Sequence, residues 1–559
     1  MKKYIPYIVL LVCLIFVILL ATKILFFRID LTQEKRFTIS KNSKELLQSL
    51  SEPASINIYL GEADANIAKL KSAVNDMLDE FSVYSSKPLT YKYINPSKAE
   101  NDAERNKNYD KLEDKGMSPI TISLRDAQGK ISQQIIFPWA EVMMKDDTLP
   151  VCIMQPTGMK TGEESVNAAI EELEYNFIDA IRILEKKSVE KIAFLEGHNE
   201  LSEIEIYFAE DALSRYYEID RGVLGNDAGI LKNYKAIVIA KPTEPFSESD
   251  KFIIDQYIMD GGKVFWLLDV IKISQEELSK QGISPVVEVD LNLNDMFFRY
   301  GVRVEPSVVQ DMQCIQTPVN VAMSGEPAKF ESVPWPYSPL LMTNPNHPTT
   351  KNLMAVKADY PSFLSQVSQE NGIQMDVLLT TSSASHIDAA PTNIDIKTMI
   401  RNKPEEYFTA QYVPVAVSME GEFESAFAHR LVPQNLENLM PRKDRSAKNK
   451  MIVVADGDII RNELDRSQKG TIGVVPLGLD RLTGQNYGNN NFIINALQYL
   501  TEDTSWIELR NRALQLRLLN KHEITAQRVF WQIINIVCPL LILTIFGLIY
   551  SMIRKYRVK

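Results

Sequence analysis

The chain has 559 residues, of which 45% are hydrophobic and 24% charged, and its formal net charge is −11. This length is too great for one hydrophobic core, so we expect three or four folded units of globular rather than disordered composition. The acidic balance argues against nucleic acid as a partner, because phosphate binding needs a basic face. Four cysteines without a CxxC pair or a Cys/His cluster exclude zinc, iron–sulfur and dithiol redox sites, so no cofactor is expected.

Two apolar runs, residues 4–27 and 529–552, are each long enough to cross a bilayer core of about 30 Å as a helix. Lys2 and Lys3 precede the first run as in a signal sequence. Leu19-Leu20-Ala21 is a poor cleavage site, so we expect residues 1–29 to be an uncleaved anchor. Basic residues flank both sides of both runs in almost equal numbers, so their distribution does not decide the orientation of the spans. The signal-like start favours cytoplasmic termini and an extracytoplasmic body between two spans.

Residues 30–150 predict a first α/β unit. Alternating and helical patterns indicate a strand at 55–60, a helix over 67–81 and a strand at 89–94, then a charged helical stretch and a hairpin over 120–137. This order suggests a thioredoxin-like unit. Because the segment GEADAN after its first strand contains no cysteine, a binding or structural module fits better than an oxidoreductase.

A long helix is expected over residues 163–187, within a connecting segment 151–190, and its apolar stripe is expected to pack against a neighbouring domain. Cys152 and Cys314 are the two cysteines outside the hydrophobic runs. They either form a disulfide or remain as two buried free thiols, and the sequence leaves both alternatives open.

Residues 191–503 predict a larger α/β domain. Continuous apolar strands alternate with helices, which indicates a parallel sheet covered on both faces. Pro and Ser residues loosen the pattern between 290 and 402. The strands are expected at 191–195, 236–240, 263–269, 377–381, 413–419 and 451–456, and the helices at 202–214, 247–259 and 491–500.

Titratable side chains follow three of these strands. They are Glu196 with His198, Asp269, and Asp456 with Asp458. Ligands of open α/β sheets bind beyond the carboxyl ends of the strands, so these five residues are candidate binding residues for a polar or metal site. The alternative is that acidic residues after a strand simply cap the next helix, and this alternative is favoured; no metal is predicted.

Two enzyme classes are suggested by short segments, and each lacks a part. Residues 193–206 resemble the strand-turn-helix of glutamine amidotransferase-like folds, but no Cys or Ser occupies a nucleophile elbow, and a solitary His198 cannot perform acyl transfer. VVADGDII resembles the DxD loop of haloacid-type phosphatases, but Ile460 replaces the usual Thr or Val. No phosphate loop of the Walker type occurs. We therefore expect no catalytic residue and no enzyme; the alternative is an envelope hydrolase that uses the strand-end acids.

Residues 504–528 predict a basic amphipathic helix beside the last membrane segment, 529–559. Such a helix lies on lipid headgroups, docks on a membrane partner, or is a solvated linker. Docking is favoured because polar side chains follow within the bilayer and would seek partners on other helices. The candidate contact residues are Leu509, Leu516 and Leu519 on the juxtamembrane helix, and Gln532 and Asn535 in the span.

Six segments, in their order along the chain, resemble the GldG family of gliding-motility-associated ABC transporter components of Bacteroidota, within the wider ABC-transporter auxiliary family. They are FFRIDLTQEKRFTIS, SEPASINIYL, AFLEGHNE, VVADGDIIRN, NYGNNNFIINALQYL, and LRNRALQLRLLN running into WQIINIVCP. The resemblance spans essentially the whole chain. It implies an inner-membrane anchor at each end, a periplasmic body, and partnership with a multi-span permease and a separate cytoplasmic ATPase. It brings no catalytic residue. The family spelling nearer to EGHGE has Gly where this chain has Asn199, which weakens the case for a backbone-approach site there.

Overall fold

The structure is a computed structural model that describes residues 38–61, 64–125, 131–154, 162–186, 189–225, 229–320, 329–367, 372–396, 404–433, 436, 442–465, 473–501 and 527–557. The chain divides into two compact units, Met1–Ala513 and Leu514–Lys559. The expected N-terminal span and residues 504–526 of the expected amphipathic helix, with Leu509, Leu516 and Leu519, lie outside the described residues.

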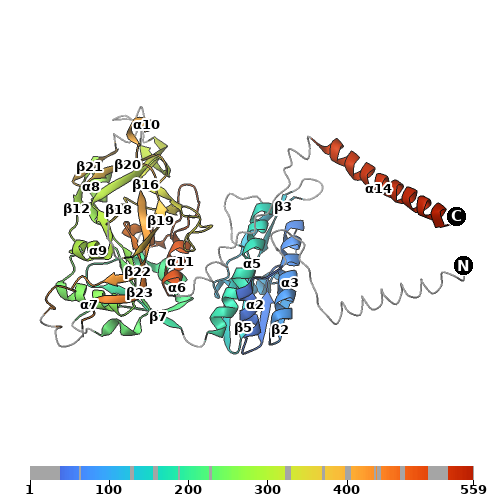
Figure 1. Ribbon diagram of the computed structural model, residues 1–559, viewed down its shortest axis with the longest axis horizontal. Coiled ribbons are helices and arrows are strands. Elements are labelled where there is room, and N and C mark those ends of the chain that lie inside the picture. Colours follow the sequence, from blue (N-terminus) through green and yellow to red (C-terminus); the bar gives the residue numbers. More distant parts are fainter. Residues whose placement is uncertain are drawn as a thin grey trace. The chain divides into compact units, whose positions relative to one another are not determined.

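The first described part, residues 38–186, is built on a four-stranded mixed sheet with the order β2-β1-β5-β6. β1 and β2 are parallel, whereas β5 is antiparallel to both β1 and β6. Asp64 caps the amino end of the crossover helix α3, because its carboxylate accepts a hydrogen bond of 2.9 Å from the backbone N–H of Ile67. Figure 1 shows α2, α3 and α5 beside these strands. The elements are α2 (Lys41–Gln48), β1 (Ala54–Ile58), α3 (Ala65–Tyr84), β2 (Leu89–Tyr93), α4 (Asp102–Glu113), β3 (Ile120–Arg125), β4 (Ile131–Ile136), β5 (Trp139–Met144), β6 (Asp147–Cys152) and α5 (Gly162–Glu185).

The stripe of the long helix α5 packs, as expected, against a neighbouring unit, the α/β unit that precedes it along the chain, and the helix thereby becomes part of the first core. Val166, Leu173 and Phe177 are buried in the same hydrophobic cluster as Ile56 of β1 and Val142 of β5. The predicted hairpin exists as the separate pair β3–β4. The β5–β6 hairpin, which the sequence analysis missed, completes the sheet and supplies the surface on which α5 packs. The expected boundary at residue 150 therefore falls inside β6.

The second described part contains a large mixed sheet with the order β15-β16-β19-β22-β23-β10-β9-β7-β8. From β8 to β23 the neighbours are parallel, and from β23 to β15 they are antiparallel. The expectation of a parallel sheet thus describes only one half of it. The strands are β7 (Glu190–Glu196), β8 (Tyr217–Val223), β9 (Ala236–Ala240), β10 (Lys263–Leu267), β15 (Cys314–Asn320), β16 (Phe330–Thr343), β17 (Val356–Lys357), β19 (Gln374–Thr380), β22 (Pro414–Glu424) and β23 (Arg445–Val454).

Helices cover both faces of the parallel half, as the continuous apolar strands predict. On one face Trp266 of β10 is fully buried and meets Phe297 edge to face, with ring centroids 5.0 Å apart. On the other face Phe265 packs against Phe492. The first face is covered by α7 (Glu248–Met259) and α9 (Asn294–Tyr300), and the second by α6 (Tyr207–Ser214) and α11 (Asn489–Thr501).

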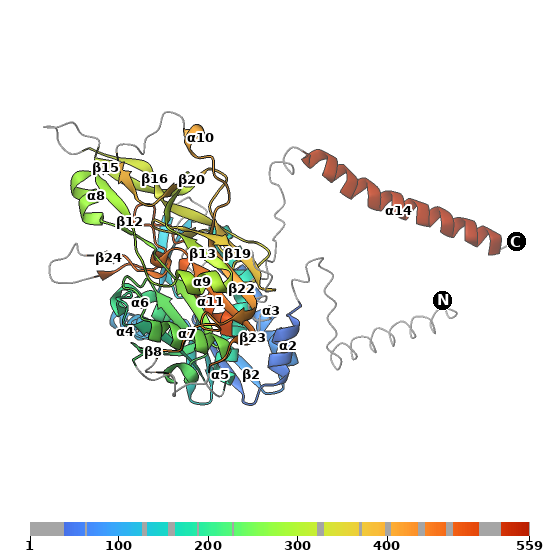
Figure 2. The ribbon, with the colours of Figure 1, turned by 60° about the vertical axis from the view of Figure 1, so that its left-hand side comes forward.

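Small antiparallel sheets fill the proline-rich stretch in which the sequence pattern loosens. They have the orders β11-β12-β21, β13-β18 and β14-β20. Figure 2 shows β12, β15, β16 and β20 gathered around α8. The remaining elements are η1 (Glu203–Glu205), η2 (Ile230–Asn233), β11 (Ile271–Ile273), α8 (Gln275–Gln281), β12 (Ile283–Glu288), β13 (Val302–Glu305), β14 (Ser307–Asp311), β18 (Phe363–Gln366), β20 (Ser385–Ala389), β21 (Thr392–Asp395), α10 (Pro404–Tyr407), η4 (Gly457–Ile460), β24 (Leu464–Asp465) and β25 (Gly473–Val474).

The second unit contains the helix α14 (Arg528–Arg557), which includes Pro539. Its stretch Phe530–Arg554 has a mean hydropathy of 2.5, and none of it is buried. By length and composition this is the one helix among the described residues that is able to cross a membrane. The second of the two expected spans is therefore present as a helix.

Candidate functional site

Three of the five predicted site residues come together at the carboxyl edge of the parallel strands. Asp269 follows β10, while Asp456 and Asp458 follow the neighbouring strand β23. One carboxylate oxygen of each lies within 4.8 Å of the others. The two strands are parallel neighbours, so their carboxyl ends meet at one edge of the sheet, and the sequence spacing brings the acids to the same place.

A lysine that the sequence analysis missed lies among these acids. Lys241 directly follows β9, and its Nζ lies 2.8 Å from Asp269 Oδ2 and 2.6 Å from Asp458 Oδ2. Burial lowers the pKa of Lys241, but the two carboxylates outweigh burial and hold this pKa above its usual range. Its ammonium therefore stays charged and takes the position between two carboxylates that a cation would need. Applying the strand-end rule to basic as well as acidic residues would have found it.

Asp456 acts as a structural cap. Its side chain is fully buried and accepts hydrogen bonds from the backbone N–H groups of Asp458, at 2.7 Å, and Asp359, at 2.8 Å. It thereby caps the short helix η4. Burial, then the neighbouring charges of Asp269 and Asp458, raises the pKa of Asp456 well above its usual value. This geometry matches the helix-cap interpretation and differs from that of an exposed nucleophile.

Glu196 and His198 have partners of their own. Glu196 pairs with Arg221 at 2.8 Å. The buried ring of His198 stacks on Phe246 and lies between two carboxylates, with Nδ1 3.1 Å from Glu200 and Nε2 3.3 Å from Asp250. Burial lowers the pKa of His198, but these hydrogen bonds outweigh it and raise the pKa to about 9. The charged His198 ring thus holds its loop in place through these contacts. It is not part of the group formed by the three aspartates.

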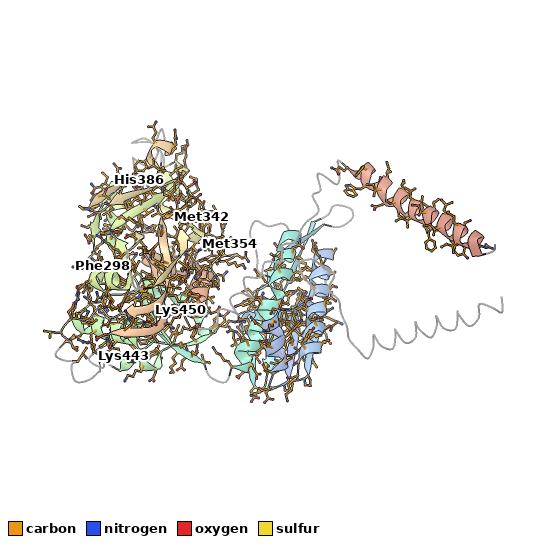
Figure 3. All side chains as sticks on the ribbon, in the orientation of Figure 1. Phe298, Met342, Met354, His386, Lys443 and Lys450 are labelled. Carbon is orange, nitrogen blue, oxygen red and sulfur yellow. The ribbon has the colours of Figure 1, made fainter. Side chains whose placement is uncertain are left out.

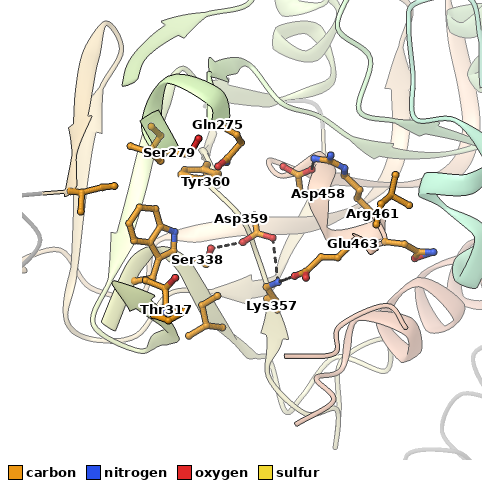
Figure 4. A pocket seen from close by; sticks show the side chains of 17 residues that line it. Gln275, Ser279, Thr317, Ser338, Lys357, Asp359, Tyr360, Asp458, Arg461 and Glu463 are labelled. Atoms are coloured by element: carbon orange, nitrogen blue, oxygen red, sulfur yellow. Dashed lines mark hydrogen bonds and ion pairs between the residues drawn. The ribbon is translucent and has the colours of Figure 1, made fainter. Parts of the chain in front are cut away.

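A pocket of about 890 Å³ opens next to Asp458 (Figure 4). Trp335 and Tyr360 form an aromatic wall, and their ring centroids are 6.4 Å apart. Across from them lie Lys357 and Glu463, whose charged atoms are 2.6 Å apart. All these side chains come from the stretches 329–367 and 456–465, far apart along the chain. The described lining residues include no His and no Cys, the residue types from which a nucleophile–base pair is commonly built.

Charges of both signs alternate along the polar side of this pocket. Lys357 Nζ also lies 3.6 Å from Asp359, which accepts a hydrogen bond from Ser338. Arg461 joins Asp458 at 3.1 Å. Burial raises the pKa of Asp359, although Lys357 opposes the shift. The pocket thus offers donors and acceptors beside a ring surface, a combination suited to holding a polar ligand or chain segment by hydrogen bonds.

Cys152 and Cys314 are free thiols, and burial raises the pKa of each to about 12. Gln532 and Asn535 lie one turn apart on the exposed surface of α14. Figure 3 places the side chains on the ribbon, including those of α14.

Comparisons with known proteins bear on the same region. The model of a family described as an ABC-type uncharacterized transport system matches residues 190–496, and the model of a domain of unknown function matches residues 33–143. A protein of Borreliella burgdorferi known only as an uncharacterized protein is 22% identical over 553 residues, which cover 96% of this chain and 95% of that protein.

Among solved structures, the mmIFT52 N-terminal domain is 13% identical, with a TM-score of 0.32, over 56% of this chain and 98% of that one. The exo-beta-1,4-mannosidase Op5Man5 from an Opitutaceae bacterium is 8% identical, with a TM-score of 0.18, over 76% of this chain and 51% of that one. Both TM-scores are too low to support an argument about this chain.

Proposed function

The chain belongs to the family of ABC-type transport system auxiliary proteins, and we propose that it is a non-enzymatic, membrane-anchored subunit of an ABC transporter complex. The observation that carries the proposal is the family match over residues 190–496, which takes in the whole large sheet, together with the apolar helix α14. Its proposed partners are a multi-span permease, a separate cytoplasmic ATPase and membrane lipid. One or two spanning helices are too few to enclose a polar path through the bilayer, so other subunits would supply it.

Within this proposal the body is periplasmic, both termini are cytoplasmic, and the protein serves gliding motility as in the GldG family. The ordered segments that resemble that family support this assignment. Asn199 supports it as well, because its φ of 56° lies in the left-handed region, where the glycine of the family spelling is favoured. The chain departs from the family here in residue type and retains the backbone conformation that glycine suits.

The non-enzymatic role is supported by how the strand-end residues are engaged. Asp269 and Asp458 are held by Lys241, Asp456 caps η4, and His198 is held by two carboxylates. The alternative, an envelope hydrolase, would use the pocket beside Asp458. We assign this pocket instead to binding, with Trp335 and Tyr360 contacting a ring or apolar face and Lys357 and Asp359 contacting polar groups.

We also assign residues 38–186 to a thioredoxin-like unit and the large domain to a glutamine-amidotransferase-like scaffold. For the first, the support is the strand order β2-β1-β5-β6 with its two antiparallel joins, and the crossover α3. For the second, it is the parallel run from β8 to β23 with helices on both faces. Both units would then be scaffolds used for recognition.

Affinity purification of the tagged full chain from native membranes tests the proposal. We expect a permease and an ATPase subunit to co-purify in fixed proportion, and the purified complex to bind no stoichiometric metal through Asp269, Asp456 and Asp458. Loss of both partners under mild detergent, with hydrolytic turnover that Asp458→Asn abolishes, would support the hydrolase instead. Alkaline phosphatase fused near residue 225 should be active, whereas an inactive fusion there with an active one after Lys559 would overturn the topology.

A further inference from the structure

A second, smaller cavity lies at the opposite edge of the parallel strands, where β9 and β10 begin. Its volume is about 300 Å³. We call it the amino-edge pocket. Its charged lining residues are Lys232, Lys235, Lys263 and Asp260, and its rings are Tyr234 and Tyr257. Three lysines against one aspartate give the lining a positive balance, in a chain whose net charge is −11.

Specific packing builds this pocket. The ring of Tyr257 lies so close over Gly262 that a Cβ atom added to the glycine would be 2.3 Å from the ring. The Tyr257 hydroxyl donates a hydrogen bond of 3.0 Å to the carbonyl of Tyr234. This bond connects the segment before β9 to the end of α7. Lys235 and Lys263 lie next to each other at the amino ends of β9 and β10. The wall is therefore fixed by glycine, by ring packing and by a backbone contact.

Lys263 is the central cation of this pocket. Its Nζ donates a hydrogen bond to Asn449 Oδ1, and the buried Asn449 is itself fixed by two hydrogen bonds of 2.9 Å to the carbonyls of Ile258 and Gly262. Lys235 lies 3.8 Å from Glu190 and Lys450 lies 3.8 Å from Glu420, whereas among the residues that the structure describes no carboxylate forms an ion pair with Lys263. A half-buried ammonium held by one neutral amide retains N–H groups for a further acceptor.

Neighbouring lysines add to the positive charge around Lys263. The paired residues Val264 and Met451 of β10 and β23 place Lys450, labelled in Figure 3, next to Lys263 across the sheet. Burial, then the charges of Lys450 and Lys235, lowers the pKa of Lys263 to about 8, although Glu420 opposes the shift. The aspartate of the pocket, Asp260, is already paired with Lys443. An anion is the group that would relieve this repulsion.

We propose that the amino-edge pocket binds a small phosphate-bearing anion through Lys263, Lys235 and Lys232. Lysines act as separate point charges and are common phosphate ligands, whereas planar carboxylates favour the fork of arginine, and the described residues that line this pocket include no arginine. A phosphate group carries about −1.5 to −2 charges at neutral pH, which matches several lysines better than a single carboxylate does. Since a water takes about 30 Å³ of liquid volume, the cavity has room for the group and several waters.

The test is calorimetric titration of the purified full chain in neutral detergent with inorganic phosphate at constant ionic strength. We expect saturable binding, weakened at least tenfold by Lys263→Gln and by the double change Lys232→Gln with Lys235→Gln. The control Lys280→Gln removes an exposed lysine that pairs with Glu276 on α8, outside the pocket, and should bind as the wild type does. The double variant changes two exposed side chains, so it stays informative if Lys263→Gln fails to fold.

Absence of phosphate binding by the wild type, unchanged affinity of a folded pocket variant, or equal affinity for succinate would overturn the proposal. Glycerol phosphate is the second probe. Its tighter binding assigns a phospholipid headgroup as the source of the phosphate, and tighter binding of inorganic phosphate assigns a free one. In addition, the bound anion should raise the pKa of Lys263, so binding at pH 8 should take up a proton in the wild type and not in Lys263→Gln. Co-purification of the permease is independent of all these outcomes.

Discussion

Gly457 packs so closely against Lys241 that a Cβ atom added to the glycine would lie 2.5 Å from Cβ and 3.0 Å from Cα of the lysine. The backbone of Lys241 is itself in the left-handed region, with a φ of 54°. The N–H of Gly457 donates a 2.6 Å hydrogen bond to Asp269. One glycine, in the loop after β23, thus contacts both the lysine after β9 and the acid after β10. The loops at the carboxyl edge of the sheet are therefore closely packed against one another.

Gly457→Ala should therefore destabilise the protein, because the new methyl group would meet Cβ, Cγ and Cα of Lys241, which lie at the base of that side chain and not at its far, flexible end. We expect a loss of about 1 to 3 kcal/mol, the usual range for overpacking. The measurement is chemical denaturation of the purified protein. Gly222→Ala is the matched control, since a Cβ atom there has nothing within 4 Å. Equal stabilities of the two variants would contradict the close packing.

Lys241→Met should lower the free energy of unfolding by more than Gly457→Ala does, by about 3 to 5 kcal/mol. The reason is that it leaves buried carboxylates without their cation. Lys280→Met, which breaks an exposed pair with Glu276, should cost less than about 1 kcal/mol. Burial raises the pKa of Asp269 even beside Lys241, and removing the lysine raises it further. An acid whose folded pKa is raised binds more protons when folded, so the deficit of Lys241→Met should shrink as the pH falls from 8 to 5. A deficit that is independent of pH would contradict this account.

The sequence located part of this site because of a simple geometric rule. Asp269 and Asp458 follow apolar strands that are long enough to recognise, and parallel strands end at one edge. Lys357, Asp359 and Trp335 could not be predicted from the sequence, for a different reason. They come from β16 and its surroundings, where Pro334, Pro336 and Pro339 break the alternation that identifies a strand. Their position depends on antiparallel pairing over long sequence distances, which local patterns do not encode.

The same physical limit applies to the first core. The helix α5 was predicted from its stripe, but its partner was not, because β5 and β6 lack clean alternation: β5 is buried at most of its positions, and β6 contains Pro150. A stripe shows that a helix has a buried face and does not show what covers it. The domain boundary was therefore placed too early, inside β6.

His198 gives a prediction that depends on pH. Its pKa is raised from 6.5 to about 9 in the folded protein. A base with a raised folded pKa stabilises fully below its unfolded pKa and loses that contribution as the pH rises through the folded value. The free energy of unfolding of the wild type should exceed that of His198→Gln by at most about 3 kcal/mol near pH 6, since one pKa unit corresponds to ~1.4 kcal/mol. The difference should fall away between pH 6.5 and 9.

His429→Gln is the control for His198→Gln, because the side chain of His429 is 81% exposed and its replacement should leave stability unchanged at every pH. We further expect His198→Ala to leave the transporter complex assembled and its function within a few-fold of normal. A loss of function of about a hundredfold in a folded protein would match the removal of a general base instead, and the non-enzymatic proposal would be wrong.

The last prediction concerns contacts in the membrane. Gln532 and Asn535 lie on the exposed surface of α14, one turn apart. Polar side chains in lipid bond to neighbouring helices, with measured contributions of about 0.6 to 1.7 kcal/mol each. If they contact the permease, changing both to Leu should weaken its co-purification about seven- to three-hundredfold while the helix still inserts, because two such contributions are lost together.

Val537→Leu provides the control for this double change, because position 537 is on the opposite side of α14 and its replacement keeps the span apolar. The expected juxtamembrane helix gives the second arm. Replacing Leu509, Leu516 and Leu519 together by Asp should release the permease if that helix docks on it, with both spans still inserted. Retention of the permease by the triple variant but not by the span variant would confine the contact to the bilayer, because only the span variant then removes a bond that the permease needs. Wild-type retention by both variants would mean that neither segment holds the partner, and the docking hypothesis would be wrong.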